Sequence, residues 1–497
     1  MTIKVTINRL NTGVPGLDEV LGGGLPEFSF NLIAGPPGSG KTTLAHQLMF
    51  ALATAARPAL YFTALGEPTL KMLRYQQQFS FFDATAIDRS VQFIDLSAEA
   101  TSGDLDLVLR RIADEVAARG PSLVFVDSFR TLVIACQVKD KMKQGGQDFV
   151  QRLAIMMTGW QATTFLIGQF PSEHEEDPVY SVADGLIWMH QSVQRNSMVR
   201  KMEVIKMRGQ PTLPGLHTFR IETAGIEVFA PAHTIAVARP AANAAKSRTR
   251  LQMGIPLLDE MLGGGLPRGY SLLVAGPSGS GKSILAAAFL AEGVRSGETG
   301  VIAAFEQRPS KSRNPVLAAL IDQGTVALVD SRAPDLSIDE IVLLMVKEIR
   351  RLKATRVVID SLSGFELAIA PTFRDDFRES LSRLVTALAD TGVTVLMTSE
   401  LEDRYTDLRF SPYGTAFLTD AIILQRYIEV DSRLRRVMAV VKVRSSNHSD
   451  ELREFTIGDD GIRIGNTLPD QEGLLGGSPS KQPDTHHNGA GSVHATQ

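Results

Sequence analysis

GPPGSGKT occupies residues 35–42 of this chain and GPSGSGKS occupies residues 276–283. Each octamer fits the pattern G-x-x-x-x-G-K-[ST], a glycine-rich loop whose backbone N–H groups cradle phosphates. The segments that precede the octamers also repeat, as GVPGLDEVLGGGLP at 13–26 and GIPLLDEMLGGGLP at 254–267. Because the copies align without a gap through the loop lysine, the chain is predicted to be a tandem duplication of a nucleotide-binding domain.

Both loops are expected to bind phosphates, because glycines let backbone N–H groups point inward and the following helix adds the positive end of its dipole. Lys41 and Lys282 are predicted to reach the β- and γ-phosphates, and Thr42 and Ser283 to ligate Mg²⁺ through their hydroxyls. A glycine-rich turn without a ligand is the alternative, which the duplication disfavours. The expected phosphate-binding residues are Gly35, Pro36, Pro37, Gly38, Ser39, Gly40, Lys41, Thr42, Thr43, Gly276, Pro277, Ser278, Gly279, Ser280, Gly281, Lys282 and Ser283.

Short apolar runs alternate with helical patterns along both copies. Strands are predicted at 30–34 and 270–275, directly before the two loops. Apolar residues at helical spacing predict a helix at 105–119, which a glycine ends. The stretch SIDE at 337–340 indicates a capping box that opens a helix at 341–352. Strands that alternate with helices favour an α/β fold, in which helices flank a mainly parallel sheet.

Two further predicted strands, at 123–126 and 357–359, end in the acidic residues Asp127 and Asp360. In P-loop ATPases an aspartate at such a strand end holds the Mg²⁺ shell. An aspartate there could instead only cap the next helix. Since each aspartate follows its own phosphate loop along the chain, both are predicted to act at a metal site.

Composition limits the class of protein. The chain has 497 residues, of which 44% are hydrophobic and 21% charged, so each half can bury a core. The net charge of −4 argues against a protein that coats nucleic acid. The single cysteine, Cys136, allows no disulfide framework and no zinc ribbon, and we expect it to be a small semi-buried side chain. Because no apolar run reaches the ~18 residues of a membrane span and no signal peptide is evident, a cytoplasmic location without a membrane contact is expected.

Four segments are predicted along the chain. The first domain covers 1–232, and a linker rich in alanine, proline and basic residues covers 233–250. The second domain covers 251–465. The remainder, 466–497, is rich in glycine, proline and serine without an apolar period, so a disordered tail is expected there.

Taken together, the lead-in segments, the two loops and the strand-end aspartates resemble the RecA-like P-loop ATPases of the KaiC type. The resemblance covers about 8–232 and 250–465, in the tandem order of that family. It implies two tandem RecA-like domains with ATP and Mg²⁺ as ligands. It also implies a homo-hexameric double ring in which ATP lies between neighbouring subunits.

The resemblance further implies two adjacent glutamates after the second strand of each domain, which activate the attacking water. Here the corresponding pairs are Gly66-Glu67 and Glu306-Gln307, so each domain keeps one carboxylate. Glu67 and Glu306 are the candidate catalytic residues, and Glu306 is favoured because it matches the first glutamate of the pair. Slow or absent hydrolysis in one ring, with either glutamate only a surface residue, is the alternative.

Members of the family also send a Lys-x-Arg from a late hairpin into the neighbour's site, where it acts like an arginine finger in trans. The first domain has Lys206 and Arg208, and the second has Lys442 and Arg444 followed by His448. A solvated basic strand end is the alternative. The presence of the motif at the matching place in both domains favours the trans-acting role.

Clock members of the family phosphorylate a Ser-Thr pair just before a T-D-x-I-I-L segment, which stands here at 419–424. The aligned pair is Ala416-Phe417, and neither residue has a hydroxyl. Thr415 and Ser411 lie nearby as substitute acceptors. The chain is therefore expected to be a KaiC homologue without the clock phosphorylation switch.

Four functions follow from these residues, and the first is favoured. It is an ATP-binding, slowly ATP-hydrolysing regulatory ATPase whose nucleotide state decides which signalling protein docks. A serine/threonine autokinase is disfavoured by Ala416-Phe417. A DNA recombinase or helicase is disfavoured by the net charge, although a basic cluster occurs at Arg433, Arg435 and Arg436. A non-catalytic nucleotide-gated scaffold, for a partner such as a histidine kinase, remains open because the glutamate pairs are incomplete.

Overall fold

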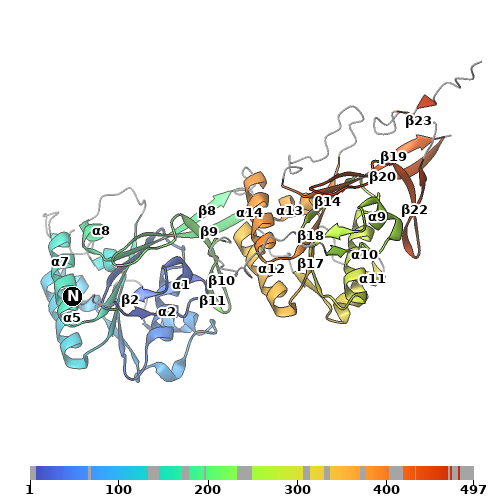
Figure 1. Ribbon diagram of the computed structural model, residues 1–497. Coiled ribbons are helices and arrows are strands. Elements are labelled where there is room, and N and C mark those ends of the chain that lie inside the picture. The colour runs from blue at the N-terminus through green and yellow to red at the C-terminus, as the bar shows by residue number, and fades with distance from the viewer. Residues whose placement is uncertain are drawn as a thin grey trace, which may run out of the picture. The chain divides into compact units, whose positions relative to one another are not determined.

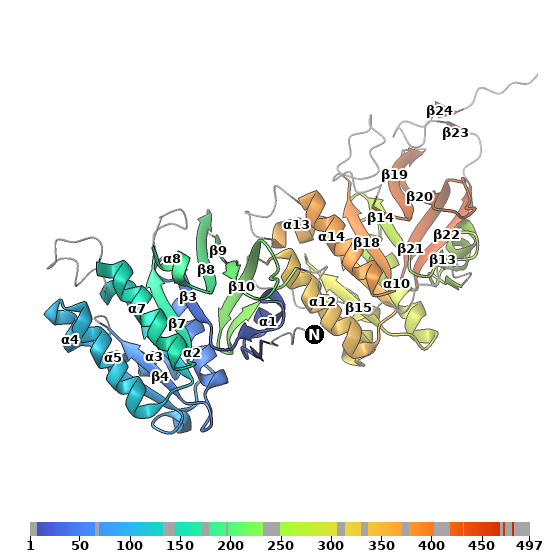
Figure 2. The same cartoon turned by 60° about the vertical axis from the view of Figure 1, so that its left-hand side comes forward.

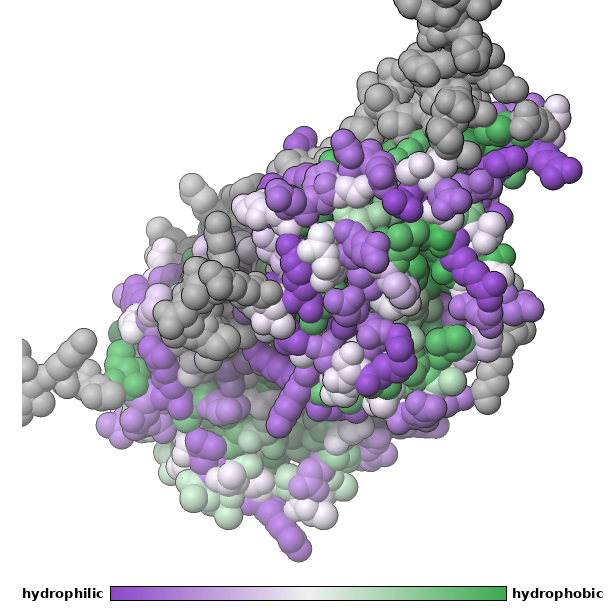
Figure 3. Space-filling model, turned by 45° about the vertical axis from the view of Figure 1, so that its right-hand side comes forward, coloured by the Kyte–Doolittle hydropathy of each residue, from purple (hydrophilic) through white to green (hydrophobic). Residues whose placement is uncertain are grey.

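The chain forms two compact units, Met1–Ile235 and Ala236–Gln497, which are described separately (Figure 1). Polar side chains cover most of the face visible in Figure 3, with smaller apolar patches between them. Among the helices described, none is long and apolar enough to cross a membrane. The computed structural model describes residues 7–64, 69–132, 145–170, 178–194, 197–231, 249–305, 314–329, 336–369, 377–401, 418–430, 432–467, 471–472 and 480–481.

The first unit is built on a nine-stranded sheet in the order β11-β10-β9-β8-β3-β7-β6-β4-β5. The strands from β8 to β5 are parallel, and β8 to β11 continue as an antiparallel meander. The strands are β3 Phe30–Gly35, β4 Ala59–Thr63, β5 Val91–Asp95, β6 Leu123–Asp127, β7 Thr163–Gln169, β8 Gly185–Gln194, β9 Ser197–Met207, β10 Leu216–Glu222 and β11 Gly225–Val228.

Helices cover both faces of this sheet, and β6 shows why. Val124 and Val126 join the apolar cluster that includes helices α5 and α7, whereas Leu123 and Phe125 join the cluster that includes α2. A strand buried on both faces reads as a continuous apolar run, as 123–126 does. The helices are α1 Leu17–Val20, α2 Lys41–Leu52, α3 Thr69–Gln76, α4 Ser97–Ser102, α5 Leu105–Arg119, α7 Gly145–Gly159 and α8 Pro178–Val182.

The second unit repeats this topology, with strand order β16-β15-β17-β18-β14-β19-β20-β21-β22. Helices α12 and α14 lie side by side against its sheet (Figure 2). The helices are α9 Pro256–Met261, α10 Lys282–Arg295, α11 Pro315–Asp322, α12 Ile338–Leu352, α13 Leu362–Ala368 and α14 Phe377–Asp390. The strands are β14 Ser271–Gly276, β15 Gly300–Ala304, β16 Val326–Val329, β17 Arg356–Asp360, β18 Thr394–Glu400, β19 Ala421–Val430, β20 Arg433–Val443, β21 Arg453–Gly458 and β22 Gly461–Thr467. The expected α/β class, with two RecA-like units, is confirmed.

The repeated lead-in segment has a structural role. In each unit it pairs two short strands, β1 Arg9–Leu10 with β2 Leu25–Pro26, and β12 Arg250–Leu251 with β13 Leu266–Pro267. The first of its three consecutive glycines has φ +78 and the next two have +113 and +108, which side-chain-bearing residues rarely adopt. The aspartate of the motif accepts a backbone N–H, from Thr12 to Asp18 and from Met253 to Asp259. The motif therefore builds a turn closed by two short strands, directly before the first central strand of each sheet.

Some predicted element bounds need correction. Helix α12 begins at Ile338, not at residue 341, because Ser337 is the N-cap and the rest of the capping box forms the first helical turn. Strand β14 begins one residue later than expected, at Ser271, and β3 runs one residue further, through Gly35. Helix α5 has the predicted bounds 105–119, with Gly120 left-handed at its C-cap. Cys136 lies outside the described residues.

The domain boundaries stay a prediction. Strand β12 already begins at Arg250, and β22 continues through Thr467 into the segment expected to be a tail. Beyond it, the described residues pair β23 Gln471–Glu472 with β24 Ser480–Lys481.

Candidate functional site

The first phosphate loop joins the end of β3 to the start of α2. Gly35, Gly38 and Gly40 have φ values of +147, +76 and +100, and Gly40 is the N-cap of α2. A Cβ at Gly35 would lie 2.2 Å from the Met189 carbonyl oxygen, so the backbone passes β8 too closely for any side chain. The loop glycines thus allow the turn that presents the first N–H groups of α2, a helix start suited to phosphate.

Lys41 curls back over the loop that precedes it. Its Nζ donates to the Pro36 carbonyl oxygen at 2.7 Å and reaches Ser39 Oγ at 3.5 Å. Burial lowers the pKa of Lys41 to about 8, and the charge of Asp127 opposes that shift. In the described hydrogen bonds the acceptors of this ammonium are neutral, so an anionic ligand in the loop would favour its charged form.

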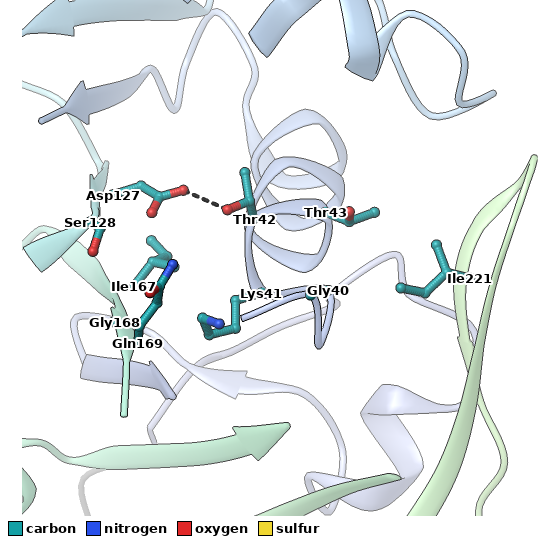
Figure 4. Close-up of a pocket in the computed structure, with 11 residues that line it drawn as sticks. Gly40, Lys41, Thr42, Thr43, Asp127, Ser128, Ile167, Gly168, Gln169 and Ile221 are labelled. Atoms are coloured by element: carbon teal, nitrogen blue, oxygen red, sulfur yellow. Dashed lines mark hydrogen bonds between the residues drawn. The ribbon is translucent and has the colours of Figure 1, made fainter. Parts of the chain in front are cut away.

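Thr42 and Asp127 meet across the pocket (Figure 4). Thr42 Oγ1 donates to Asp127 Oδ2 at 2.8 Å, and the Tyr61 hydroxyl donates to the same oxygen at 2.8 Å. Burial raises the pKa of Asp127, while the hydrogen bonds from Thr42 and Tyr61 and the charge of Lys41 counteract it. Sequence positions 42 and 127 therefore come together because β6 and β3 lie on either side of β7 in the sheet, and Thr42 lies on the helix that follows β3.

Lys41, Thr42 and Asp127 line a pocket with a volume of about 290 Å³. In Figure 4 Lys41, Thr42, Asp127 and Gln169 lie on one side, whereas Thr43 and Ile221 lie away from the carboxylate. The lining residues are Gly38, Gly40, Lys41, Thr42, Thr43, Asp127, Ser128, Ile167, Gly168, Gln169 and Ile221.

The donor set fits Mg²⁺. A hydroxyl and a carboxylate oxygen stand 2.8 Å apart beside the phosphate loop, and Mg²⁺ prefers oxygen ligands. In the part of the chain that the structure describes, no three His, Cys, Asp or Glu side chains group to hold a metal alone.

The second loop places its lysine and its capping glycine in the same way as the first. Lys282 Nζ donates to the carbonyl oxygens of Gly276 at 2.9 Å and Pro277 at 2.8 Å, and Gly281 (φ +100) caps α10. Asp360 accepts a hydrogen bond of 2.5 Å from Thr398 Oγ1 of β18.

Two hydrogen bonds join β19 to the second loop, and one backbone feature is common to both units. Ser280 Oγ donates to Gln425 Oε1 at 3.0 Å, and the Tyr427 hydroxyl donates to the Ser278 carbonyl at 3.4 Å, so β19 supports the second loop. In both units a cis peptide bond joins the strand-end aspartate to the serine that follows it.

The Lys-x-Arg residues lie where β9 and β20 end, at the opposite end of each hairpin from its turn. Lys206 Nζ donates to the carbonyls of Tyr180 and Ser181, both at 3.2 Å, and Arg208 pairs with Asp184 at 3.2 Å. Neither Lys206 nor Arg208 lines the first pocket. Burial, and then the charge of Arg208, lowers the pKa of Lys206.

The second unit places its copies in the same way. Lys442 Nζ donates to the Thr419 carbonyl at 2.7 Å and Arg444 pairs with Asp420 at 3.3 Å. His448 Nδ1 lies 3.0 Å from the Ser449 carbonyl oxygen. In both hairpins the pairing register shifts just before the lysine, between Leu186 and Ile187 and between Ile422 and Ile423. Such a bulge re-aims a side chain at a strand end.

The candidate catalytic residues Glu67 and Glu306 lie outside the described residues, as do Thr415, Ser411 and Ala416-Phe417. Their roles stay predictions. The sequence reasoning, in turn, missed Tyr61, Thr398, Gln169 and Ile221. The only sequence signal for Tyr61 is a hydroxyl inside an otherwise apolar strand, and for Thr398 a threonine near the end of one.

Comparison with known proteins agrees with this geometry. The family model described as ATPase: KaiC matches residues 10–233 and 251–468. The Circadian clock protein KaiC3 of Synechocystis sp. is 28% identical over 493 residues, covering 95% of this chain and 95% of that protein. The Circadian clock oscillator protein KaiC of Picosynechococcus sp. is 25% identical over 489 residues, covering 96% of this chain and 93% of that protein.

Proposed function

Since the chain belongs to the KaiC family of ATPases, we propose that it binds ATP with Mg²⁺ at both phosphate loops and hydrolyses it. We further propose that it works as a homo-hexameric regulatory ATPase that gates a signalling partner. The meeting of Lys41, Thr42 and Asp127 in one pocket carries this proposal, because two sequence motifs 85 residues apart supply one donor set.

Each loop residue has a distinct task in this proposal. The loop N–H groups and the start of α2 hold the phosphates, and Lys41 adds charge at the β- and γ-phosphates. Asp127 orients the metal shell from the end of β6. Bound Mg²⁺ would neutralise charge on the phosphates and so favour departure of ADP. The second unit uses Lys282, Ser283 and Asp360 in the same way.

The water that attacks the γ-phosphate needs a group that orients it, which we assign to Glu306 in the second unit and Glu67 in the first. Because Gly66 replaces the first glutamate of the pair, we expect the second unit to hydrolyse faster. Arg208 and Arg444 would reach the γ-phosphate of the neighbouring subunit. The absence of Lys206 and Arg208 from the lining of their own unit's pocket supports a role in trans.

The experiment is phosphate release from ATP with Mg²⁺ by the wild type and by Lys41→Ala and Lys282→Ala separately. We expect release to fall mainly in Lys282→Ala, while binding of a fluorescent ATP analogue is lost only when both lysines are replaced. Failure of the wild type to bind the analogue would overturn the proposal. Binding without release would leave a nucleotide-gated scaffold and refute the hydrolytic part.

An autokinase is the second candidate, because the family resemblance implies phosphorylation of a Ser-Thr pair in clock members, and the relatives bear the names of circadian clock proteins. Ala416-Phe417 stands where the acceptor pair is expected, so we propose regulation through nucleotide state instead of phosphorylation. Intact mass after incubation with ATP decides between them. An added phosphate, on Thr415 or Ser411 or elsewhere, would contradict our preference.

A further inference from the structure

We propose that Tyr61 is a positioning residue of the first site, whose phenol holds Asp127 in the orientation that the metal shell needs. Thr398 has this task for Asp360 in the second unit, and it reaches the carboxylate from the opposite side. The inference rests on the proposed Mg²⁺-nucleotide site and names what differs between its two copies.

The Tyr61 ring is fixed on both faces. The side chain is 0% exposed, and the ring stacks on His46 of α2 at 4.6 Å between centroids and on Phe125 of β6 at 5.8 Å. Phe93 of β5 contacts the same ring at 5.4 Å. A phenol clamped in this way cannot turn away without disturbing the core, so its hydroxyl stays aimed at Asp127 Oδ2, 2.8 Å away.

The strand register shows that the donors to Asp127 and Asp360 come from opposite sides of the acidic strand. Asp127 pairs with Ile167 on β7, a residue without a hydrogen-bonding side chain. In the second unit Ile359 pairs with Met397, so the next residues, Asp360 and Thr398, lie side by side, and Thr398 donates to the carboxylate. Because the β7 residue opposite Asp127 offers no side-chain donor, β4 on the other side of β6 supplies the Tyr61 hydroxyl instead.

The same register identifies what replaces the tyrosine in the second unit. On β4, Tyr61 lies two residues before the residue that pairs with Asp127. On β15, Ile302 lies two residues before the residue that pairs with Asp360. His46 lies five residues after Lys41, where Ala287 lies five after Lys282. The stacked pair His46–Tyr61 thus corresponds to Ala287 and Ile302, which carry no donor toward the aspartate.

Asp127 benefits from a second donor because one of its oxygens is shared between two hydroxyl groups. Thr42 and Tyr61 both donate to Asp127 Oδ2. A Thr42 hydroxyl that ligates a metal through an oxygen lone pair keeps its proton, but the metal then sets its orientation. The Tyr61 hydroxyl is the donor to this buried carboxylate whose position does not depend on the metal. Loss of such an outer partner commonly lowers metal affinity or activity by about 10–100-fold.

The test uses the full chain with Lys282→Ala, which silences the second site, and compares it with the same chain carrying Tyr61→Phe. Phenylalanine keeps the stacks on His46 and Phe125 and removes only the hydroxyl. We measure binding of a fluorescent ATP analogue as Mg²⁺ is raised, and analogue binding without Mg²⁺. The Mg²⁺ concentration for half-maximal effect should rise about tenfold, with metal-free binding unchanged.

Two further variants sharpen the result. Adding Ile167→Thr to Tyr61→Phe builds the contact that Thr398 makes in the second unit, and should restore most of the Mg²⁺ response. The mirror variant, Thr398→Val in a Lys41→Ala chain, should raise the Mg²⁺ requirement of the second site by a similar factor.

An unchanged Mg²⁺ requirement in Tyr61→Phe would overturn the inference. Equal loss of binding with and without Mg²⁺, uncorrected by Ile167→Thr, would also overturn it, because it would reveal a general packing defect. If the Lys282→Ala parent binds no analogue at any Mg²⁺ concentration, the proposed nucleotide site at the first loop fails instead.

Discussion

His46 lies on α2, four residues past Thr42, and its ring is fully buried against Tyr61. Neither ring nitrogen has a hydrogen-bond partner in the described structure. Burial lowers the pKa of His46 from 6.5 to about 3, so the imidazole is neutral in the folded protein at neutral pH. The unfolded chain binds a proton at this histidine below pH 6.5, and the folded chain does not until about pH 3. Stability contributed by the neutral ring is therefore full above pH 6.5 and is lost as the pH falls toward 3.

We predict that His46→Phe makes the first unit less sensitive to acid. Between pH 7.5 and pH 5 the wild type should lose about 2 kcal/mol more unfolding free energy than the variant. Both tryptophans of the chain, Trp160 and Trp188, lie in the first unit, so urea unfolding followed by tryptophan fluorescence reports on that unit. Equal acid sensitivity of the two proteins would show that this ring stays uncharged in both states.

At the scale of elements, the phosphate loop depends on a helix start without a side chain. Gly40 has φ +100, and a Cβ there would lie 2.7 Å from Ile221 Cδ1. Gly120, at the end of α5, has φ +55 with nothing within 4 Å of its Cβ position. The two glycines share a left-handed backbone and differ in the space around them, so they form a matched pair.

We predict that Gly40→Ala, in a Lys282→Ala chain, abolishes binding of the fluorescent ATP analogue. The variant meets backbone strain at φ +100, which is further from the range that alanine can adopt than the φ of Gly120, and its Cβ has to push the tip of Ile221 aside, so the N–H groups of α2 are displaced. Gly120→Ala meets the strain alone, should cost about 1 kcal/mol of stability, and should leave binding intact. Analogue binding by Gly40→Ala at wild-type affinity would show that the loop tolerates a Cβ.

At the scale of the whole molecule, both units have one topology and each places its Lys-x-Arg at the end of a bulged hairpin. The salt bridges of Arg208 with Asp184 and Arg444 with Asp420 hold the two motifs in the same way. Two copies that keep this placement support one role for it in both units, which we take to be a contact with the next subunit.

A subunit-mixing experiment tests that role. In a Lys41→Ala background, Lys282→Ala lacks a working second loop and Arg444→Ala lacks the trans-acting arginine. Each variant alone should release little phosphate. Equal mixing should recover about a quarter of the parent rate, because random assembly in a closed ring pairs an intact loop with an intact arginine at that frequency. No recovery after verified subunit exchange would place Arg444 in the site of its own subunit, and full activity of Arg444→Ala by itself would place Arg444 outside any site.

The duplication, the α/β class, the two loops and the strands that end in Asp127 and Asp360 could all be predicted from the amino-acid sequence. These features depend on local physics: glycine allows positive φ in the loops, and buried parallel strands need unbroken apolar runs. The predicted start of α12 is three residues late. In a capping box only the first residue, here Ser337, lies outside the helix, whereas the prediction placed all four residues of the box before it.

Only the tertiary structure decided which groups surround each aspartate. Tyr61 lies 66 residues before Asp127 and Thr398 lies 38 residues after Asp360, on strands to opposite sides of the acidic one. Their meeting depends on the order β4-β6-β7 and β15-β17-β18 and on the pairing register. The periodicity of a sequence predicts which residues share a face of a strand, but it does not predict which strands lie beside it. Strand order depends on how all the helices and strands pack together.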